Sequence, residues 1–366
     1  MNTRNNRSRY ERMPVICLVF YGLALLSIGL YIAFCSSTAF ADGFNRTVSA
    51  AIRAALSYLT AWIPFSLGEL TIWLLPLALF FVLRHAIRYR CGSWRAAAVY
   101  VGILLSVIAL LFSTFVLTFS ASYRARPLAE KLGMEQTAVS KNELYNTTVA
   151  LVEAINAEAE HLSFQKNGFS IMPYSLSGMN KHLSDAYADV SHTHTFLPHA
   201  AARVKPILLS GVMSYTHVTG IYSFFTGEAN LNVRFPDYTL PATAAHELAH
   251  QRGIAREDEA SFLAFLVCTE SDDPYVRYSG YMMAYEYVSG ALWRADSTLY
   301  YKAITKLSNE VRGELAAYGR FFEKYENSVA GNISSSINDS YLQSQGTPGV
   351  KSYGMVVDLV VAYYRK

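Results

Sequence analysis

Two histidines and a glutamate within residues 246–250, which read HELAH, are the residues best suited to chemistry in this chain. On a helix, His246 and His250 are four positions apart and share a face, so both imidazoles can bind one divalent ion. Glu247 would lie beside a metal-bound water, where a carboxylate can act as general base. The pattern therefore predicts a hydrolytic site in which Zn²⁺ acidifies a bound water.

A hydrolytic zinc ion held by two histidines needs a third protein ligand. Glu257, Asp258 and Glu259 directly follow a turn expected at Gly253, and a helix running back past the first would carry one of them toward the metal. The alternative for these acids is a solvated helix start, where the helix dipole favours negative charge. The alternative for HELAH is a surface helix with solvated histidines, but the surrounding alanines and Leu248 favour partial burial.

The segments next to the motif are expected to position it. Residues 241–253 and 257–270 are typical of two helices joined by a tight turn. Residues 211–235 are rich in β-branched and aromatic residues, which predicts one or two strands with turns at Gly220 and Gly227. An extended substrate could pair with the edge of this strand region.

The remainder of the C-terminal part mixes helical and irregular patterns. Helical periodicity marks four further segments, at residues 141–162, 278–294, 303–325 and 355–364. Three segments lack it: residues 168–182 are expected to form a strand or loop, 192–207 to be irregular and then helical, and 327–349 to be a polar stretch. His192, His194 and His199 are interpreted as polar loop residues, with a second metal cluster as the alternative.

Hydrophobic residues make up 52% of the 366 residues and charged residues only 16%, which indicates membrane segments beside a soluble part. Three apolar runs, at residues 14–36, 61–83 and 96–119, are long enough to span a bilayer. A cleaved signal peptide is the alternative for the first run, although its apolar core is longer than such peptides use. Residues 44–58 are amphipathic and are expected to lie on the membrane surface, and Glu69 to be interfacial or packed against a helix.

The positions of the basic residues predict how the three runs are oriented across the membrane. Arginines crowd the N-terminus and residues 84–95, so the positive-inside rule places both in the cytoplasm and everything after the third run outside. We therefore expect an α-helical membrane region, residues 1–122, in the cytoplasmic (inner) membrane, followed by a mainly α, α+β extracytoplasmic domain, residues 123–366. The net charge of +3 gives no reason to expect nucleic-acid binding, and the four cysteines offer no disulfide framework.

The motif and the acids after it resemble the gluzincin type of zinc metallopeptidase. In membrane and sensor members of that group the third-ligand helix reads Glu-x-x-Ala-Asp or Glu-x-x-Ala-Asn. Residues 257–261, Glu-Asp-Glu-Ala-Ser, fit this register with Glu257 as ligand. They depart from it at Ser261, where an acid or amide would bond to a zinc histidine, and Glu259 remains a rival ligand.

More narrowly, the chain resembles the bacterial membrane family DUF3810. The features are the three apolar runs, FTGEANLN at 225–232, PDYTLPATAAHELAHQRGIAREDEASFLA, and SYGMVVDLVVAYY near the end. Together the resemblances imply a zincin-like domain with Zn²⁺ bound by His246, His250 and Glu257. A membrane-anchored peptidase acting on proteins or peptides is the leading expectation. The alternative is a non-catalytic zinc-binding sensor or assembly protein. The oxyanion-stabilising residue is left open among Tyr281, Tyr285, Tyr287, His217 and Tyr353.

Overall fold

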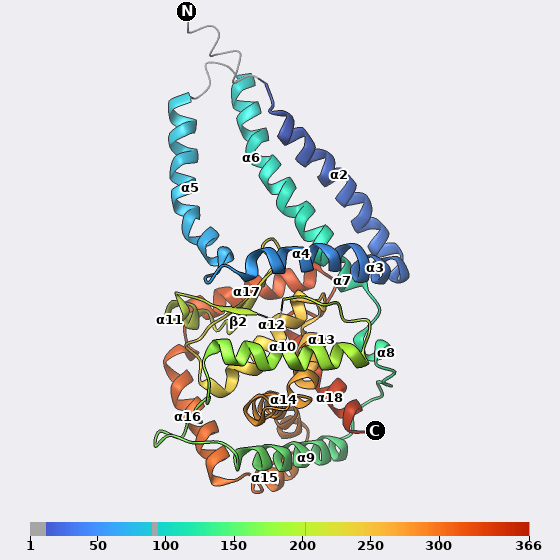
Figure 1. Ribbon diagram of the computed structural model, residues 1–366, viewed down its shortest axis with the longest axis vertical. Helices are drawn as coiled ribbons and strands as arrows, with labels where there is room; N and C mark the ends of the chain where they lie inside the picture. Colours follow the sequence, from blue (N-terminus) through green and yellow to red (C-terminus); the bar gives the residue numbers. More distant parts are fainter. Residues whose placement is uncertain (1–11, 90–93, 202, 366) are drawn as a thin grey trace, which may run out of the picture.

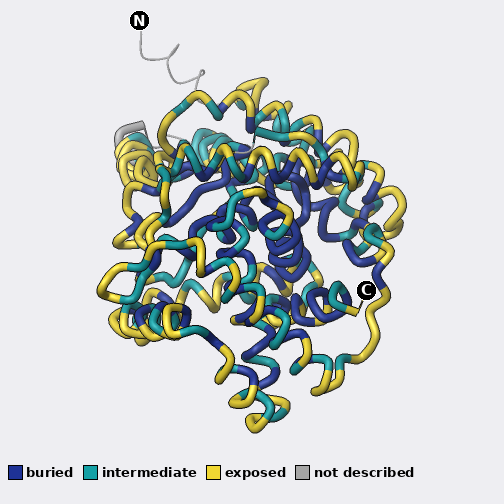
Figure 2. Tube along the Cα trace, turned by 60° about the horizontal axis from the view of Figure 1, so that its bottom comes forward, coloured by how far each residue is buried: buried dark blue, intermediate teal, exposed yellow. Residues whose placement is uncertain are grey.

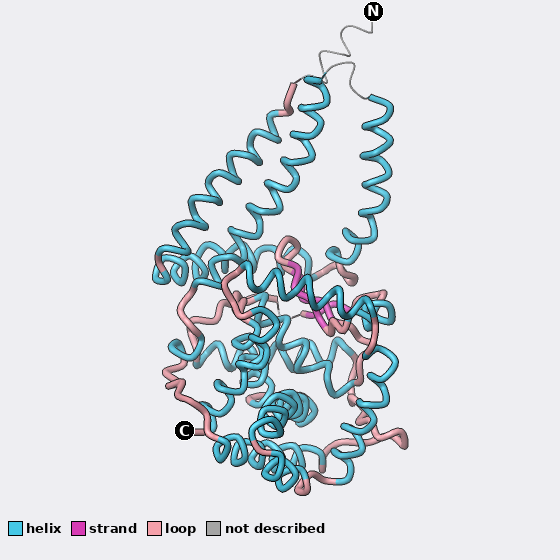
Figure 3. The backbone as a smooth tube through the Cα atoms, turned by 180° about the vertical axis from the view of Figure 1, so that it is seen from behind, coloured by secondary structure: helices cyan, strands magenta, loops and turns pink. Residues whose placement is uncertain are grey.

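The computed structural model describes residues 12–89, 94–201 and 203–365 (Figure 1). Three helices near the N-terminus are long and apolar enough to cross a membrane: α2 (Val15–Ser36), α5 (Leu67–Tyr89) and α6 (Trp94–Phe115). Helices α2 and α6 lie side by side, whereas α5 lies apart from them in both side views (Figures 1 and 3). The three predicted apolar helices are confirmed by length and composition.

The second of these helices starts later than the sequence indicates. Residues 62–66 form a turn, and α5 begins at Leu67. One hydroxyl group and one carboxylate cap its first turn. Ser66 Oγ accepts a hydrogen bond from the Glu69 backbone N–H at 2.9 Å, and the Glu228 carboxylate accepts from Leu67 and Gly68 at 3.1 and 2.9 Å. The helix therefore begins six residues after the predicted start at residue 61, which is about one and a half helical turns.

A bent helical segment lies across the base of the three apolar helices (Figure 1). It consists of α3 (Thr38–Phe44), the π-helical turn η1 (Asn45–Ser49) and α4 (Ala50–Ala61). A second π-helical turn, η2 (Val116–Ser120), and α7 (Ala121–Arg124) continue α6 and pack against it. The segment predicted to be amphipathic, residues 44–58, is helical and two-sided: Arg53 is buried within the protein, whereas Val48 and Tyr58 are exposed.

The C-terminal part is mostly helical and contains one small sheet. Its strands are β1 (Val204–Pro206), β2 (Gly220–Ser223) and β3 (Glu228–Leu231), in the order β1-β3-β2. Two strands and the turn at Gly227 are confirmed within residues 211–235: β2 and β3 pair antiparallel, and Gly227, with φ +71°, forms their turn. The turn predicted at Gly220 is wrong, because Gly220 is the first residue of β2 and pairs with Leu231. The helical ending predicted for residues 192–207 is wrong, because this segment instead gains parallel pairing with β3, a long-range contact that periodicity does not reveal.

Three buried helices form the centre of the domain: α12 (Leu240–Gln251), α13 (Glu257–Thr269) and α14 (Pro274–Ala295). The dark tubes of Figure 2 show this centre enclosed by more exposed elements. Helices α9 (Lys141–Ala159) and α18 (Val356–Tyr364) pack on it, and apolar side chains of α10 (Leu176–Thr193) join the same core. Helices predicted over residues 241–253, 257–270, 141–162, 278–294 and 355–364 are confirmed.

Three other segments differ in part from the expectation. The loop expected within residues 168–182 is present up to Ser175, but the rest of the segment starts α10, whose cap residue Ser175 accepts a hydrogen bond from the Gly178 N–H. Residues 303–325 hold parts of two helices, α15 (Ser297–Ile304) and α16 (Asn309–Glu326), instead of one. The polar stretch forms α17 (Val329–Ser344), because Ser328 caps it and apolar residues recur every four positions along it. The short helical turns are α8 (Leu128–Lys131), α11 (Ser210–Met213), η3 (Ser214–Thr216), η4 (Asp237–Thr239) and η5 (Gly349–Met355).

Candidate metal centre

Helix α12 carries the HELAH residues and ends in a sharp turn. Its alanines and Leu248 are buried in the core, which fixes the helix against α13 and the sheet. Gly253 adopts φ +84°, a left-handed conformation that favours glycine, while the Ile254 N–H donates to the Ala249 carbonyl at 3.1 Å. This turn reverses the chain within five residues and starts α13 at Glu257.

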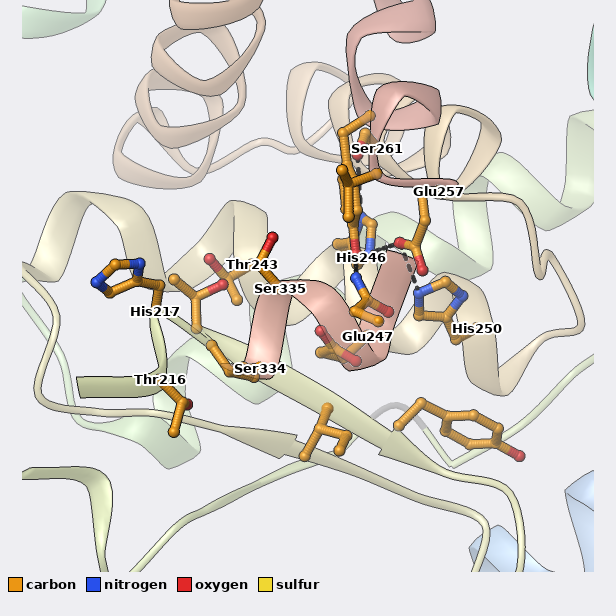
Figure 4. A pocket seen from close by; sticks show the side chains of 18 of the residues that line it. Thr216, His217, Thr243, His246, Glu247, His250, Glu257, Ser261, Ser334 and Ser335 are labelled. Atoms are coloured by element: carbon orange, nitrogen blue, oxygen red, sulfur yellow. Dashed lines mark hydrogen bonds and ion pairs between the residues drawn. The ribbon is translucent and has the colours of Figure 1, made fainter. Parts of the chain in front are cut away.

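The turn brings Glu257 to the two histidines. Its Oε2 lies 3.1 Å from Nε2 of His246 and 3.4 Å from Nε2 of His250. In Figure 4 these three side chains point toward one another. One ligand atom from each residue lies within 4.8 Å of the other two, and no other such group of His, Cys, Asp or Glu occurs among the described residues. Sequence and structure therefore select the same three side chains.

This donor set fits zinc in chemistry and in spacing. Two imidazole nitrogens and one carboxylate oxygen are the ligand types of catalytic zinc sites, which keep one position open. Ligand atoms about 2.1 Å from a tetrahedral ion lie about 3.4 Å apart. The two observed distances to Glu257 are close to this value, so an ion fits with only a small adjustment of the side chains.

Each histidine is also held through its other ring nitrogen. His250 Nδ1 lies 2.8 Å from the Ile254 carbonyl oxygen, so it must carry a proton there and leaves Nε2 free for a metal. His246 Nδ1 lies 3.2 Å from Ser261 Oγ. The serine that departs from the gluzincin pattern thus makes a hydrogen bond to the histidine that an acid or amide would bind there.

The three neighbouring acids take different places. Glu257 faces the histidines, whereas Glu259 Oε1 accepts a hydrogen bond from the Leu128 N–H at 2.9 Å and lies 3.6 Å from an Arg256 nitrogen. Asp258 is buried too, and no other His, Cys, Asp or Glu of the described residues joins it in a metal-binding group. The geometry thus brings Glu257 to the histidines and directs Glu259 away from them.

The charges of this cluster shift the pKa values of its members. Burial would lower the pKa of the His250 imidazole, but the facing Glu257 carboxylate outweighs it and raises that pKa to about 9. Burial opposes the charge of Glu257, yet His250 and His246 hold its pKa well below the usual range. Removal of the proton on His250 therefore accompanies metal binding at neutral pH.

Glu247 is placed for proton transfer. Its side chain is buried, and this burial raises the pKa of its carboxyl above the usual value, which favours proton uptake. Strand β2 crosses it so closely that a Cβ on Gly220 would lie 2.6 Å from its Cγ. The Tyr222 backbone also donates a hydrogen bond to it. Only glycine at position 220 leaves room for this carboxylate.

The cluster lies in a cavity of about 1250 Å³. Its walls include residues of β2, α12, α13, α14 and α17, and of η2 and α7, which continue α6. Figure 4 shows Ser334 and Ser335 of α17 in front of Glu247, with His217 and Thr216 farther along the cavity. Of the tyrosines and histidine left open as oxyanion donors, His217, Tyr287 and Tyr353 line this cavity and the other two do not.

The membrane region contacts the site directly. Arg53 Nη1 donates to the Thr118 carbonyl and to Asn45 Oδ1 at 2.6 and 2.9 Å, and Nη2 lies 3.4 Å from the Arg252 carbonyl oxygen. Asn45 Nδ2 donates to the Gly253 carbonyl at 3.0 Å. The Phe119 ring, at the end of the α6 extension, packs edge-on against His250 at 5.9 Å. The motif alone gave no signal for these residues, because their partners beside the motif lie far away in sequence: 199 positions separate Arg53 from Arg252, and 208 separate Asn45 from Gly253.

Comparison with known proteins identifies the family but adds no activity. No curated protein and no solved structure matches the chain. A family model described as protein of unknown function (DUF3810) matches residues 44–361, which includes α4, the apolar helices α5 and α6, and the cluster of His246, His250 and Glu257. The chain belongs to the DUF3810 family.

Proposed function

We propose that this protein is a membrane-anchored, zinc-dependent metallopeptidase. The observation that carries the proposal is the convergence of His246, His250 and Glu257 beside the buried carboxylate of Glu247, within one large cavity. Two ring nitrogens and one carboxylate oxygen bind zinc with an open position, and Glu247 supplies the adjacent base that hydrolysis needs.

The residues of the chain have separate roles in this mechanism. His246, His250 and Glu257 would hold Zn²⁺, which when bound acidifies water and polarises a carbonyl oxygen. Glu247 takes the proton of the attacking water, and its raised pKa lets it keep that proton until the amine leaves. Ser261 and the Ile254 carbonyl orient the two imidazoles.

The strand β2 supports a peptide as the substrate. It lines the cavity beside Glu247, and among the described residues its only strand partner is β3, so its other edge is open to an added strand.

Tyr353 is our choice of oxyanion donor. Burial and the nearby charges of Glu257 and Glu247 raise the pKa of its hydroxyl, so it keeps its proton and can donate a hydrogen bond.

The sidedness of the membrane is part of the proposal. Arginines near the N-terminus and within residues 84–95 favour a cytoplasmic location for both segments, and three spans then put the cavity outside the cytoplasmic membrane. The proposed substrates are therefore proteins or peptides at the outer face of that membrane.

A non-catalytic zinc-binding sensor or assembly protein would need the metal ligands only. A general base buried beside an empty coordination position has no use in such a protein, and for this reason we favour the peptidase. The peptidase and the non-catalytic protein are distinguished by turnover, because only a peptidase cleaves peptides and depends on Glu247 to do so.

The test is a peptide-library cleavage assay on the full chain in vesicles, with Glu247→Gln as the matched variant. We expect zinc-dependent cleavage that chelation removes, and a loss of about a hundred- to ten-thousand-fold in Glu247→Gln with zinc content unchanged. Zinc bound to the wild type without any cleavage would favour the non-catalytic protein. Loss of zinc from Glu247→Gln would contradict the assigned role of Glu247.

A further inference from the structure

Helix α17 crosses the cavity at the end of the domain from which the apolar helices extend (Figure 1). At its start, Ser328 Oγ donates a hydrogen bond to the Tyr215 carbonyl of η3. Near its end, the Tyr341 ring lies 6.3 Å from that of Phe115, the last residue of α6, and the Tyr123 hydroxyl donates to the Tyr341 hydroxyl at 3.1 Å. The C-terminal end of α17 is therefore held against the C-terminal end of α6.

The segment beside the other end of α17 is fixed to the start of α5. The backbone N–H groups of Leu208 and Leu209 donate to the Glu69 carboxylate at 2.8 and 2.9 Å, and Glu69 belongs to the first turn of α5. Helix α11 and η3 follow directly, and η3 contacts α17. Together α11 and α17 therefore extend between the ends of two membrane-crossing helices.

Both helices expose large apolar side chains. Val329, Ile333 and Ile337 of α17 are 73%, 55% and 66% exposed, and their four-residue spacing puts them along one side of the helix, where Ile333 and Ile337 also line the cavity. Leu208 and Val212, at α11, are 76% and 62% exposed. Apolar side chains clustered next to membrane-spanning helices are typical of a surface that contacts lipid.

Strand β2 leads from the metal centre to this membrane side. Gly220, at its start, lies against Glu247. At its other end the Tyr222 ring lies 5.4 Å from Phe119, and the Phe224 ring 5.4 Å from Phe115. Four residues of extended chain cover about 13 Å, so a strand added to β2 would join Glu247 to the end of α6 over about that length.

We propose that the α11–α17 face contacts the bilayer, and that the site takes polypeptide segments tethered to the membrane. The cleaved bond would lie within about four to six residues of the membrane anchor, from the length of β2. This substrate class rests on the proposed peptidase function, whereas the lipid contact does not.

The lipid contact is tested with the full chain in vesicles that contain brominated phosphatidylcholine. Val329→Trp adds a fluorescent probe to α17 outside the cavity lining, and Tyr301→Trp, at an exposed position on α15 at the far end of the domain, is the control. Relative to the parent chain, we expect the bromine to quench the added emission of Val329→Trp and not that of Tyr301→Trp. Equal quenching of both variants, or quenching of neither, would overturn the proposed lipid contact. It would indicate that something other than lipid covers α17, such as a second copy of the chain.

The substrate class is tested with one library sequence, the best-cleaved peptide of the assay above, offered in three forms. The forms are free peptide, peptide attached to a palmitoyl anchor by about five residues, and peptide attached by about twenty residues. The long linker keeps the peptide at the membrane, so it controls for local concentration. We expect the short form to be cleaved at least about tenfold faster than the long one, a difference of 1.36 kcal/mol in barrier.

The variant Val212→Asp with Val329→Asp, at two exposed positions that do not line the cavity, links the two halves of the proposal. It should reduce cleavage of the short tethered form and leave cleavage of free peptide unchanged, whereas Tyr301→Asp should change neither. Equal rates for the short and long forms would overturn the substrate class while leaving the peptidase function intact. Cleavage of no form, with zinc bound and α17 in contact with lipid, would instead overturn the peptidase function and the substrate class with it.

Discussion

The individual side chains around the cluster of His246, His250 and Glu257 have different roles, which single substitutions can separate. His246 and His250 present Nε2 to Glu257 because Ser261 and the Ile254 carbonyl hold their Nδ1 atoms. The hydrogen bond that the Ile254 backbone carbonyl accepts from His250 cannot be removed by a side-chain change. Ser261 is therefore the residue whose substitution isolates the orienting effect on a ligand.

We predict that Ser261→Ala weakens zinc affinity by about 10- to 100-fold, because the His246 ring loses the partner that fixes its orientation. Competition with a fluorescent zinc chelator would measure the change. Ser289→Ala, a buried serine of α14 that does not line the cavity, serves as the matched control and should bind zinc as the parent does. An unchanged affinity in Ser261→Ala would show that α12 alone orients His246.

A second prediction for a single residue concerns the effect of Tyr353 on turnover. Tyr353→Phe removes the hydroxyl and keeps the ring, so zinc affinity should stay constant while kcat falls by about 10²- to 10³-fold, as for loss of one oxyanion donor. Steady-state kinetics on a cleaved library peptide would separate kcat from KM. Tyr287→Phe, in the same cavity, is the comparison, and a larger loss there would assign the role to Tyr287.

The residues of the candidate metal centre were predictable from the sequence because their spacing is local. HELAH and the acids after Gly253 lie within fifteen residues, so helix geometry and a glycine turn suffice to bring them together. The choice between Glu257 and Glu259 needed the structure, because it depends on which face of α13 meets α12. Ser261 was named from the resemblance, but its bond to His246 became visible only in the fold.

At the scale of elements, the turn between α12 and α13 depends on the membrane region. Arg53 donates to carbonyl groups at Thr118 and Arg252, and a Cβ on Gly253 would lie only 2.1 Å from its Nη2. Burial lowers the pKa of this guanidinium to about 10, so it remains charged at neutral pH. A buried, charged donor thus fixes the turn that places Glu257.

We predict that Arg53→Met destabilises the protein by about 2 kcal/mol or more, because buried carbonyl groups lose their donor. Zinc affinity should fall as well, since the turn that carries Glu257 loses its support. Thermal unfolding in detergent and zinc titration would measure the two effects. Arg46→Met, at an exposed arginine of the same helical segment, should change neither, and equal behaviour of the two variants would contradict the role of Arg53.

Elements with strong local patterns were predicted, and elements made by distant contacts were not. Helices α12, α13 and α18 follow from periodicity, whereas β1 exists because β3 pairs with it. Helix α17 was missed although Val329, Ile333, Ile337 and Tyr341 recur every four residues. The many serines and asparagines between them hid this signal, because such residues favour turns and caps in isolation.

At the scale of the whole molecule, ion pairs join the membrane region to the domain. Asp42 of α3 lies 2.8 Å from Lys131 Nζ and 3.1 Å from Arg126 Nη2. Burial alone would raise the pKa of the Asp42 carboxyl, but hydrogen bonds and charge from these two residues outweigh it and lower the pKa below its usual value. None of these partners could be paired from the sequence, because no local pattern relates positions 42 and 131.

A lowered folded-state pKa means that the stabilisation from Asp42 is present above the unfolded value, about pH 4, and is lost as pH falls through the folded value. We therefore predict that Asp42→Asn lowers the Tm by several degrees at neutral pH. The difference from the parent should shrink below about pH 4, where Asp42 itself takes up a proton. Thermal unfolding in detergent at neutral and acid pH would check this, and a constant difference would contradict it.

The most direct test of the account is anomalous X-ray scattering at the zinc edge from crystals of the full chain grown with zinc. We predict one strong peak, about 2.0–2.2 Å from Nε2 of His246, Nε2 of His250 and one carboxylate oxygen of Glu257, with Glu247 beside it and outside the ligand set. A peak bound by Glu259 or by Glu247, or no peak within this cluster at saturating zinc, would contradict the assignment of the metal centre.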